Sequence, residues 1–74
     1  MRHYAETPRY EIAYWRLQRL RLKYTIPELC ALIGVDTYTT EFNALYEMTR
    51  RKVFITEETL KIIEDCIDAA EMLE

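Results

Sequence analysis

The chain has 74 residues, which suffice for one domain (1–74) with a single small core and leave no room for a second domain. One Gly, two Pro and no strand-length run of alternating β-branched residues predict an all-α fold, a compact bundle of four or five helices. No apolar stretch reaches signal-peptide or membrane-spanning length, so we expect a cytoplasmic protein with no membrane partner.

The net charge of −3 hides an uneven distribution of charged residues. Residues 1–27 carry six Arg and Lys against two Glu, a net charge of +4, and residues 28–52 have a net charge of −1. Residues 53–74 carry one Lys against seven acids, a net charge of −6. A molecule polarised in this way can present a basic face to phosphate and keep its acidic face away, although an ordinary solvated surface fits the same pattern.

The first helix is expected from Thr7 and Pro8 to about Lys23, after a flexible tail over residues 1–6. Its core-facing stripe consists of Tyr10, Ala13, Leu17, Leu20 and Tyr24. A second stripe is cationic and provides candidate contacts to a phosphate backbone, or simply a solvated face: Arg16, Arg19 and Lys23. Trp15 lies partly off the core stripe, and either covers the core or belongs to a partner interface.

A second helix follows a break near Tyr24. Thr25 and Glu28 have the spacing of a capping box, and Gly34 is placed to end the helix in a left-handed conformation. Asp36, Thr37 and Thr39 are all suitable caps for a third helix that runs toward Glu47. A further break is expected near Val53.

The start of the third helix carries side chains that can test base edges in a DNA major groove, because hydroxyls donate or accept and an Asn amide pairs with adenine. The candidate base-contacting residues are Thr37, Tyr38, Thr39, Thr40 and Asn43. Thr is also a common helix cap, and that interpretation stays open. Arg50, Arg51 and Lys52 follow as candidate phosphate contacts, or as complements to the negative pole of the helix.

These residues resemble a known family. Leu29, Cys30, Ile33, Gly34 and Val35 resemble the helix-turn-helix of the lambda-repressor-like family (Cro/CI, Xre), and residues 46–53 are similar to the Trp-Glu-x-Gly-Arg-x-x-Val run of its YdiL-like branch. The likeness covers roughly half of the chain. The chain departs from the family pattern as if two residues were inserted in the turn, since its apolar residues fall at Phe42 and Leu45. Thr49 also replaces the usual Gly, and Phe54 the usual Pro.

The resemblance implies a small sequence-specific DNA-binding transcriptional regulator, a repressor of the phage or mobile-element type, with double-stranded DNA as its partner. Such regulators are expected to act as dimers on a short palindrome, because one helix-turn-helix of this size makes too few contacts for strong specificity.

The last helix, capped by Thr56, has two apolar rows, which is more than one small domain must bury. The first row is Leu60, Ile63, Ile67 and Ala70, and the second is Ile62, Cys66, Ala69 and Leu73. We expect one row to lie within the subunit and the other in a homodimer. The candidate interface residues are Ile62, Cys66, Ile67, Ala70 and Leu73.

The sequence does not favour an enzyme. The single His lies at position 3, and no nucleophile with a neighbouring base, phosphate loop or metal-ligand spacing is present, so we expect no cofactor and no metal. Cys30 and Cys66 are interpreted as reduced core residues. The alternative function is a protein-interaction module, an antirepressor or inhibitor on the same scaffold, whose acidic surface binds a basic protein partner.

Overall fold

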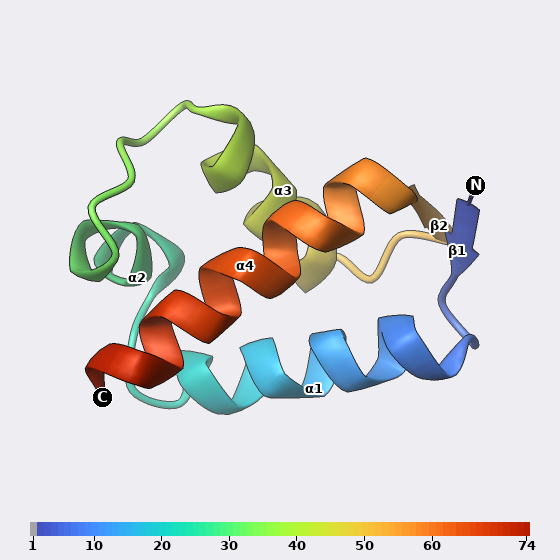
Figure 1. Ribbon diagram of the computed structural model, residues 1–74, viewed down its shortest axis with the longest axis horizontal. Coiled ribbons are helices and arrows are strands. Elements are labelled where there is room, and N and C mark those ends of the chain that lie inside the picture. Colours follow the sequence, from blue (N-terminus) through green and yellow to red (C-terminus); the bar gives the residue numbers. More distant parts are fainter. Residues whose placement is uncertain (1) are drawn as a thin grey trace.

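A computed structural model describes residues 2–74, which form four helices and one pair of short strands (Figure 1). In chain order the elements are β1 (Arg2–Tyr4), α1 (Pro8–Arg21), α2 (Ile26–Leu32), α3 (Thr40–Thr49), β2 (Phe54–Thr56) and α4 (Glu57–Leu73). The long helix α4 packs against the other three helices and against both strands. Helices α1 and α4 lie side by side and run in the same direction (Figure 1).

The helices begin where the sequence predicts. Thr25 and Glu28 form the expected capping box at α2, and Thr56 accepts a hydrogen bond from the backbone N–H of Thr59 at the start of α4. Thr7 occupies the cap position of α1, but its hydroxyl donates to the carbonyl oxygen of Tyr4 at 2.7 Å instead of capping the helix. Gly34 has a φ of +76°, as its place after α2 requires.

The prediction of an all-α fold is wrong in one respect, because β1 and β2 pair antiparallel with His3 opposite Ile55. Three apolar or β-branched residues favour an extended chain at β2, and Ile55 is buried there. Residues Arg2–Tyr4, expected in a flexible tail, therefore form a strand, while Met1 lies outside the described residues. The ring of Phe54 packs against that of Tyr4, with centroids 5.9 Å apart.

The core confirms the apolar stripe of α1 and the first apolar row of α4. Leu17, Leu20, Leu60, Ile63, Ile67 and Ala70 are at most 1 % exposed. Each fully buried Leu or Ile stabilises the fold by about 1.5–3 kcal/mol. The phenol of buried Tyr10 donates to the backbone carbonyl of Lys52 at 2.8 Å, which anchors the α3–β2 connection to α1.

The core also corrects the expected dimer interface. Ile67 and Ala70 are fully buried and Cys66 is only 6 % exposed, so these three residues hold the subunit together and cannot meet a second one. Ile62 is half-buried and Leu73 is exposed. Cys30 and Cys66 are free and buried, as predicted. No helix in residues 2–74 is both long and apolar enough to cross a membrane.

Candidate nucleic-acid interface

The expected phosphate-binding stripe of α1 is largely occupied by acids of α4. Arg16 bridges Asp68 and Glu71, each at 2.5 Å, and Lys23 lies 3.2 Å from a carboxylate oxygen of Glu74. The hydrogen bonds from Arg16 to Glu71 and Asp68 raise the pKa of its guanidinium above the ordinary value. Because these cations already have carboxylate partners, the prediction that Arg16 and Lys23 contact DNA phosphate has no support in this geometry.

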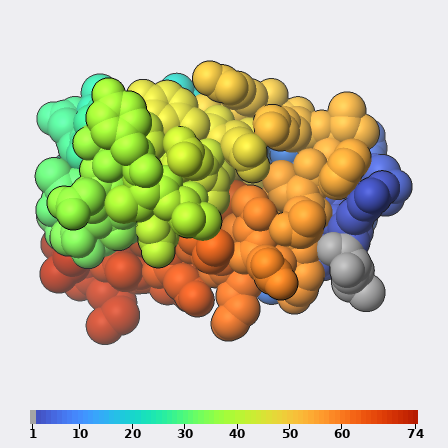
Figure 2. Space-filling model, turned by 90° about the horizontal axis from the view of Figure 1, so that it is seen from above, coloured from blue at the N-terminus to red at the C-terminus, as the bar shows by residue number. Residues whose placement is uncertain are grey.

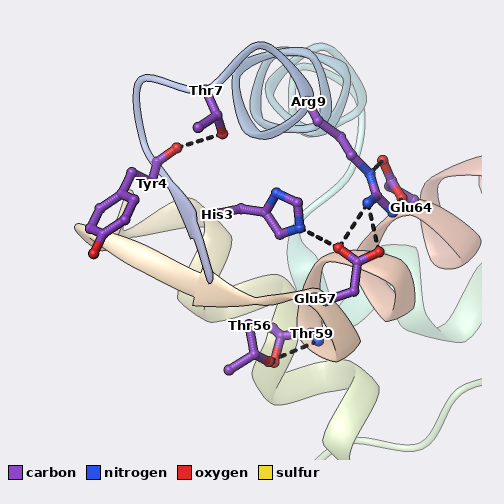
Figure 3. Close-up of polar contacts among 8 residues, drawn as sticks. All are labelled: His3, Tyr4, Thr7, Arg9, Thr56, Glu57, Thr59 and Glu64. Atoms are coloured by element: carbon purple, nitrogen blue, oxygen red, sulfur yellow. Dashed lines mark hydrogen bonds and ion pairs between the residues drawn. The ribbon is translucent and has the colours of Figure 1, made fainter. Parts of the chain in front are cut away.

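The side of the molecule on which the cations of α1 meet the acids of α4 is called the α1–α4 flank. A third bridge, at the other end of this flank, involves residues that the sequence interpretation missed (Figure 3). Arg9 forms ion pairs with Glu57 at 2.7 Å and with Glu64 at 2.6 Å. His3 from β1 also contacts the Glu57 carboxylate. The hydrogen bond from Arg9, and to a lesser extent that from His3, lowers the pKa of the Glu57 carboxyl below its usual value. This cluster joins β1, α1 and α4.

The flank has a sequence signal that could have revealed it. Its cations, Arg9, Arg16 and Lys23, are spaced by seven residues, which is close to two helical turns. The acids Glu57, Glu64 and Glu71 have the same spacing. Two parallel helices with matched heptad spacing bring these opposite charges together once per two turns.

The base-contacting candidates at α3 separate into a cap and an exposed group. Thr39 is the N-cap: its hydroxyl accepts from the N–H of Phe42 and donates to the carbonyl oxygen of Asp36 at 2.8 Å. Its side chain is thus occupied by helix initiation, so its assignment as a base reader has no support here. Thr37, Tyr38, Thr40 and Asn43 are exposed.

The outer face of α3 also carries a row of aromatic rings. Phe42 packs against Tyr38 at 5.9 Å and against Tyr46 at 4.9 Å between ring centroids. A shallow hollow of about 410 Å³ on this face is lined by Tyr38, Phe42, Asn43, Tyr46, Glu47 and Arg50. Figure 2 looks onto this side of the molecule, where the green and yellow residues of the α2–α3 connection and of α3 cover much of the surface.

Tyr38 is held in an uncommon backbone conformation. Its φ is +67°, in the left-handed region that side chains other than Gly seldom adopt, and its side chain is 88 % exposed. Such conformations cost about 1–3 kcal/mol and are concentrated at functional sites. The conformation places a large exposed aromatic side chain just before α3.

The cationic cluster after α3 is divided in the same way. Arg51 bridges Glu11 and lies over the ring of Tyr14, with its guanidinium carbon 4.5 Å from the centroid. Lys52 pairs with Glu47 at 3.0 Å, and both side chains are substantially exposed. In the part of the chain that the structure describes, Arg19 and Arg50 are the two phosphate candidates without a carboxylate partner.

Those two arginines lie on different faces. Arg50 lines the hollow on α3, together with Asn43 and Tyr38. Arg19 lies on the outer face of α1, where it lines two other hollows with Trp15. The structure therefore unites Tyr38, Asn43 and Arg50 in one candidate site and leaves Arg19 outside it.

Within residues 2–74 no group of three or more His, Cys, Asp and Glu side chains is arranged to hold a metal ion. Burial raises the pKa of the Cys66 thiol to about 11, which leaves it protonated and unreactive near neutral pH. Comparison of the chain with protein-family models, with curated proteins and with solved structures found no match.

Proposed function

We propose that the chain is a small sequence-specific DNA-binding regulator that inserts the outer face of α3 into a major groove. The supporting observation is the set of exposed polar side chains on that face: Tyr38, Thr40, Asn43 and Arg50. Among the described residues, none of these four side chains has a hydrogen bond or ion pair to another part of the chain. They are therefore available to a ligand, unlike the cations of the α1–α4 flank.

The chemistry of this face suits base edges. The Asn43 amide can pair bidentately with adenine, and Thr40 offers a hydroxyl together with a methyl group that fits thymine. Arg50 stands at the end of α3, where a guanidinium can bind a backbone phosphate and fix the orientation of the helix. A helix of ten residues is about 15 Å long, which is adequate for one pass across a groove about 12 Å wide.

The connection between α2 and α3 differs from that of the helix-turn-helix that the chain resembles in sequence. Such helices are usually joined by a turn of about three or four residues, whereas residues 33–39 lie between these two. This connection of seven residues is three or four residues longer than such a turn, more than the two extra residues inferred from the family pattern. It also supplies Tyr38, which gives the proposed reading surface an aromatic group.

The electrostatic contribution to binding should be small. Near α3, Arg50 is the one phosphate candidate of the described residues without a carboxylate partner, since Lys52 pairs with Glu47 and Arg51 with Glu11. One phosphate contact corresponds to a slope of about −0.9 in log K against log salt for each subunit. We therefore expect weak binding to random DNA, and strong binding only where two copies occupy a palindromic site.

The test is binding of the whole chain to a palindromic duplex selected from a random library, measured by fluorescence anisotropy at several salt concentrations. Asn43→Ala should reduce the difference in binding free energy between the selected duplex and random duplexes by about 1–3 kcal/mol. Arg50→Ala should weaken binding to all duplexes alike and lower the salt slope by about one. Arg21→Ala, on α1, removes an equal charge and should change neither quantity. Selection that yields no preferred duplex, or unchanged affinity in both α3 variants, would overturn the proposal.

The second candidate is a protein-interaction module, favoured by the aromatic row of Tyr38, Phe42 and Tyr46 beside Arg50. Tyr and Arg are enriched at protein interfaces and at their energetic centres. Its expected acidic binding surface is reduced, since Glu57, Glu64, Asp68 and Glu71 are bridged within the chain. Under this function the DNA selection fails, and Tyr38→Ser abolishes binding to the protein partner while leaving the fold intact.

A further inference from the structure

The outer face of α1 exposes large apolar side chains that the subunit does not use. Ile12 is 62 % exposed, Trp15 60 % and Leu22 87 %, and helical periodicity places the three on one side of the helix. Together they present on the order of 400 Å² to solvent. An apolar face of this size on so small a domain indicates an interaction surface.

Trp15 is held in position at the centre of this face. Its indole Nε1 donates to a carboxylate oxygen of Glu11 at 3.0 Å, and its ring meets the edge of Tyr14 with centroids 5.0 Å apart. Shallow hollows of about 390 and 410 Å³ lie on the two sides of it. A fixed aromatic ridge between two hollows is suited to a central contact, since little side-chain entropy is lost on binding.

We infer that this face binds a second copy of the chain, with the two α1 helices antiparallel across a two-fold axis at Trp15. Such an axis brings together residues equally distant from Trp15 on opposite sides. Glu11 then faces Arg19 of the second copy, because both positions are four residues from Trp15. Within its own subunit the Glu11 carboxylate already contacts Arg51 and the Trp15 indole, so Arg19 of the second copy would share this acid with them.

One further apolar pair matches in this register, whereas Ile12 faces Gln18 of the second copy, each three residues from Trp15. Leu22 and Pro8 are each seven residues from Trp15, so the most exposed apolar side chain of the face meets the apolar ring that begins the partner helix. Each Trp15 can enter a hollow beside its counterpart. The same patch thus provides both the projecting and the receiving surface, as an isologous interface requires. Arg19, which has no carboxylate partner among the described residues, gains two-fold related Glu11 contacts.

The patch is smaller than a stable interface requires, which sets the expected affinity. Standard interfaces bury about 800 Å² per partner, and the three apolar side chains supply about half of that. Polar side chains at the edge, Gln18 among them, contribute the rest. We expect a monomer–dimer equilibrium with a dissociation constant on the order of 10 μM.

This inference does not rest on the proposed DNA function, because the hollows of α1 share no lining residue with that of α3. Sedimentation equilibrium of the full chain without DNA, from about 1 to 300 μM, should show reversible dimerisation. Trp15 is the single Trp of the sequence, so its emission should shift to shorter wavelength over the same range. Trp15→Gln should weaken association by roughly thirtyfold or more. Met72→Gln, at an exposed apolar residue of α4, should leave it unchanged.

A mixing experiment tests the antiparallel register. Glu11→Arg places two cations in each cross-subunit pair, and Arg19→Glu places two acids there, so each variant alone should associate on the order of tenfold more weakly. Mixed in equal amounts, the two variants should form a heterodimer that is tighter than either variant alone, since every cross-subunit pair is again of opposite charge. It should be weaker than the original dimer, because Glu11→Arg also removes the contacts of Glu11 with Arg51 and Trp15 in its own subunit. Circular dichroism is the control that tests whether each variant is folded. A chain that stays monomeric at 300 μM, or folded variants whose mixture associates no better than either alone, would overturn the inference.

Discussion

The flank between α1 and α4 and the outer face of α3 use polar side chains in opposite ways. On the flank, Arg9 and Arg16 each meet two carboxylates of α4, so their charges are neutralised within the fold. On α3, Asn43 and Arg50 are exposed and make no such contact among the described residues. The comparison teaches that a cation-rich segment need not provide a cationic binding surface, because the partner that neutralises it can lie fifty residues away.

The largest expected effect lies beneath the flank. Ile67→Asp buries an unpaired carboxylate in a fully buried position and should destabilise the chain by more than about 4 kcal/mol, leaving it largely unfolded at 25 °C. Ile62→Asp, at a half-buried neighbour on the same helix, should cost clearly less and leave a cooperative transition. Urea denaturation followed by circular dichroism measures both. Equal stability of the two variants would mean that the rows of α4 are wrongly placed.

A matched pair of arginine variants separates the two regions directly. Arg16→Met removes the partner of Asp68 and Glu71 and should lower the free energy of unfolding by about 1 kcal/mol, since all three side chains are partly exposed. Its affinity for the selected duplex should be unchanged. Arg50→Met should change stability by less than about 0.5 kcal/mol but weaken DNA binding. The reverse pattern would assign DNA contact to the flank.

The turn that precedes α3 allows a backbone test of similar size. Gly34→Ala should destabilise the chain by about 1 kcal/mol, because φ is +76° there while a Cβ would meet no atom within 4 Å. Tyr38→Gly, at a φ of +67°, should cost little or stabilise slightly, yet weaken ligand binding by the face of α3. Thermal unfolding measures the change in stability, and titration with the selected duplex measures the change in binding. A large stability loss on Tyr38→Gly would indicate that its ring supports the fold.

The smallest expected effect is the pH dependence of the bridge at Glu57. Arg9 and His3 lower the pKa of this carboxyl below its ordinary value of 4.5, so its contribution to stability is present above pH 4.5 and is lost as pH falls through the lower folded pKa. Glu57→Gln should therefore flatten the decline in stability between about pH 5 and pH 2. Denaturant unfolding across that range provides the measurement. If the variant lost stability toward low pH as steeply as the original chain, the bridge at Glu57 would not persist in solution.

Much of the local structure follows from the sequence alone. Caps at Thr25 and Thr56, the single Gly after α2 and the apolar stripes of α1 and α4 predicted helix boundaries and core faces, because these signals act within one or two turns. The strand pair was missed because a three-residue strand is stabilised by its partner, and His3 and Ile55 are far apart in the sequence.

The candidate site was predictable only in part. Asn43 and Tyr38 were identified by residue type and are exposed. Thr39 was identified in the same way, but its side chain caps the start of α3. What the sequence by itself determined is the set of helices and the inward face of each. Tertiary packing decided which charges are neutralised, which apolar row of α4 is buried and which face of α1 is exposed to solvent. Each of these depends on a contact with a segment that is distant in the sequence.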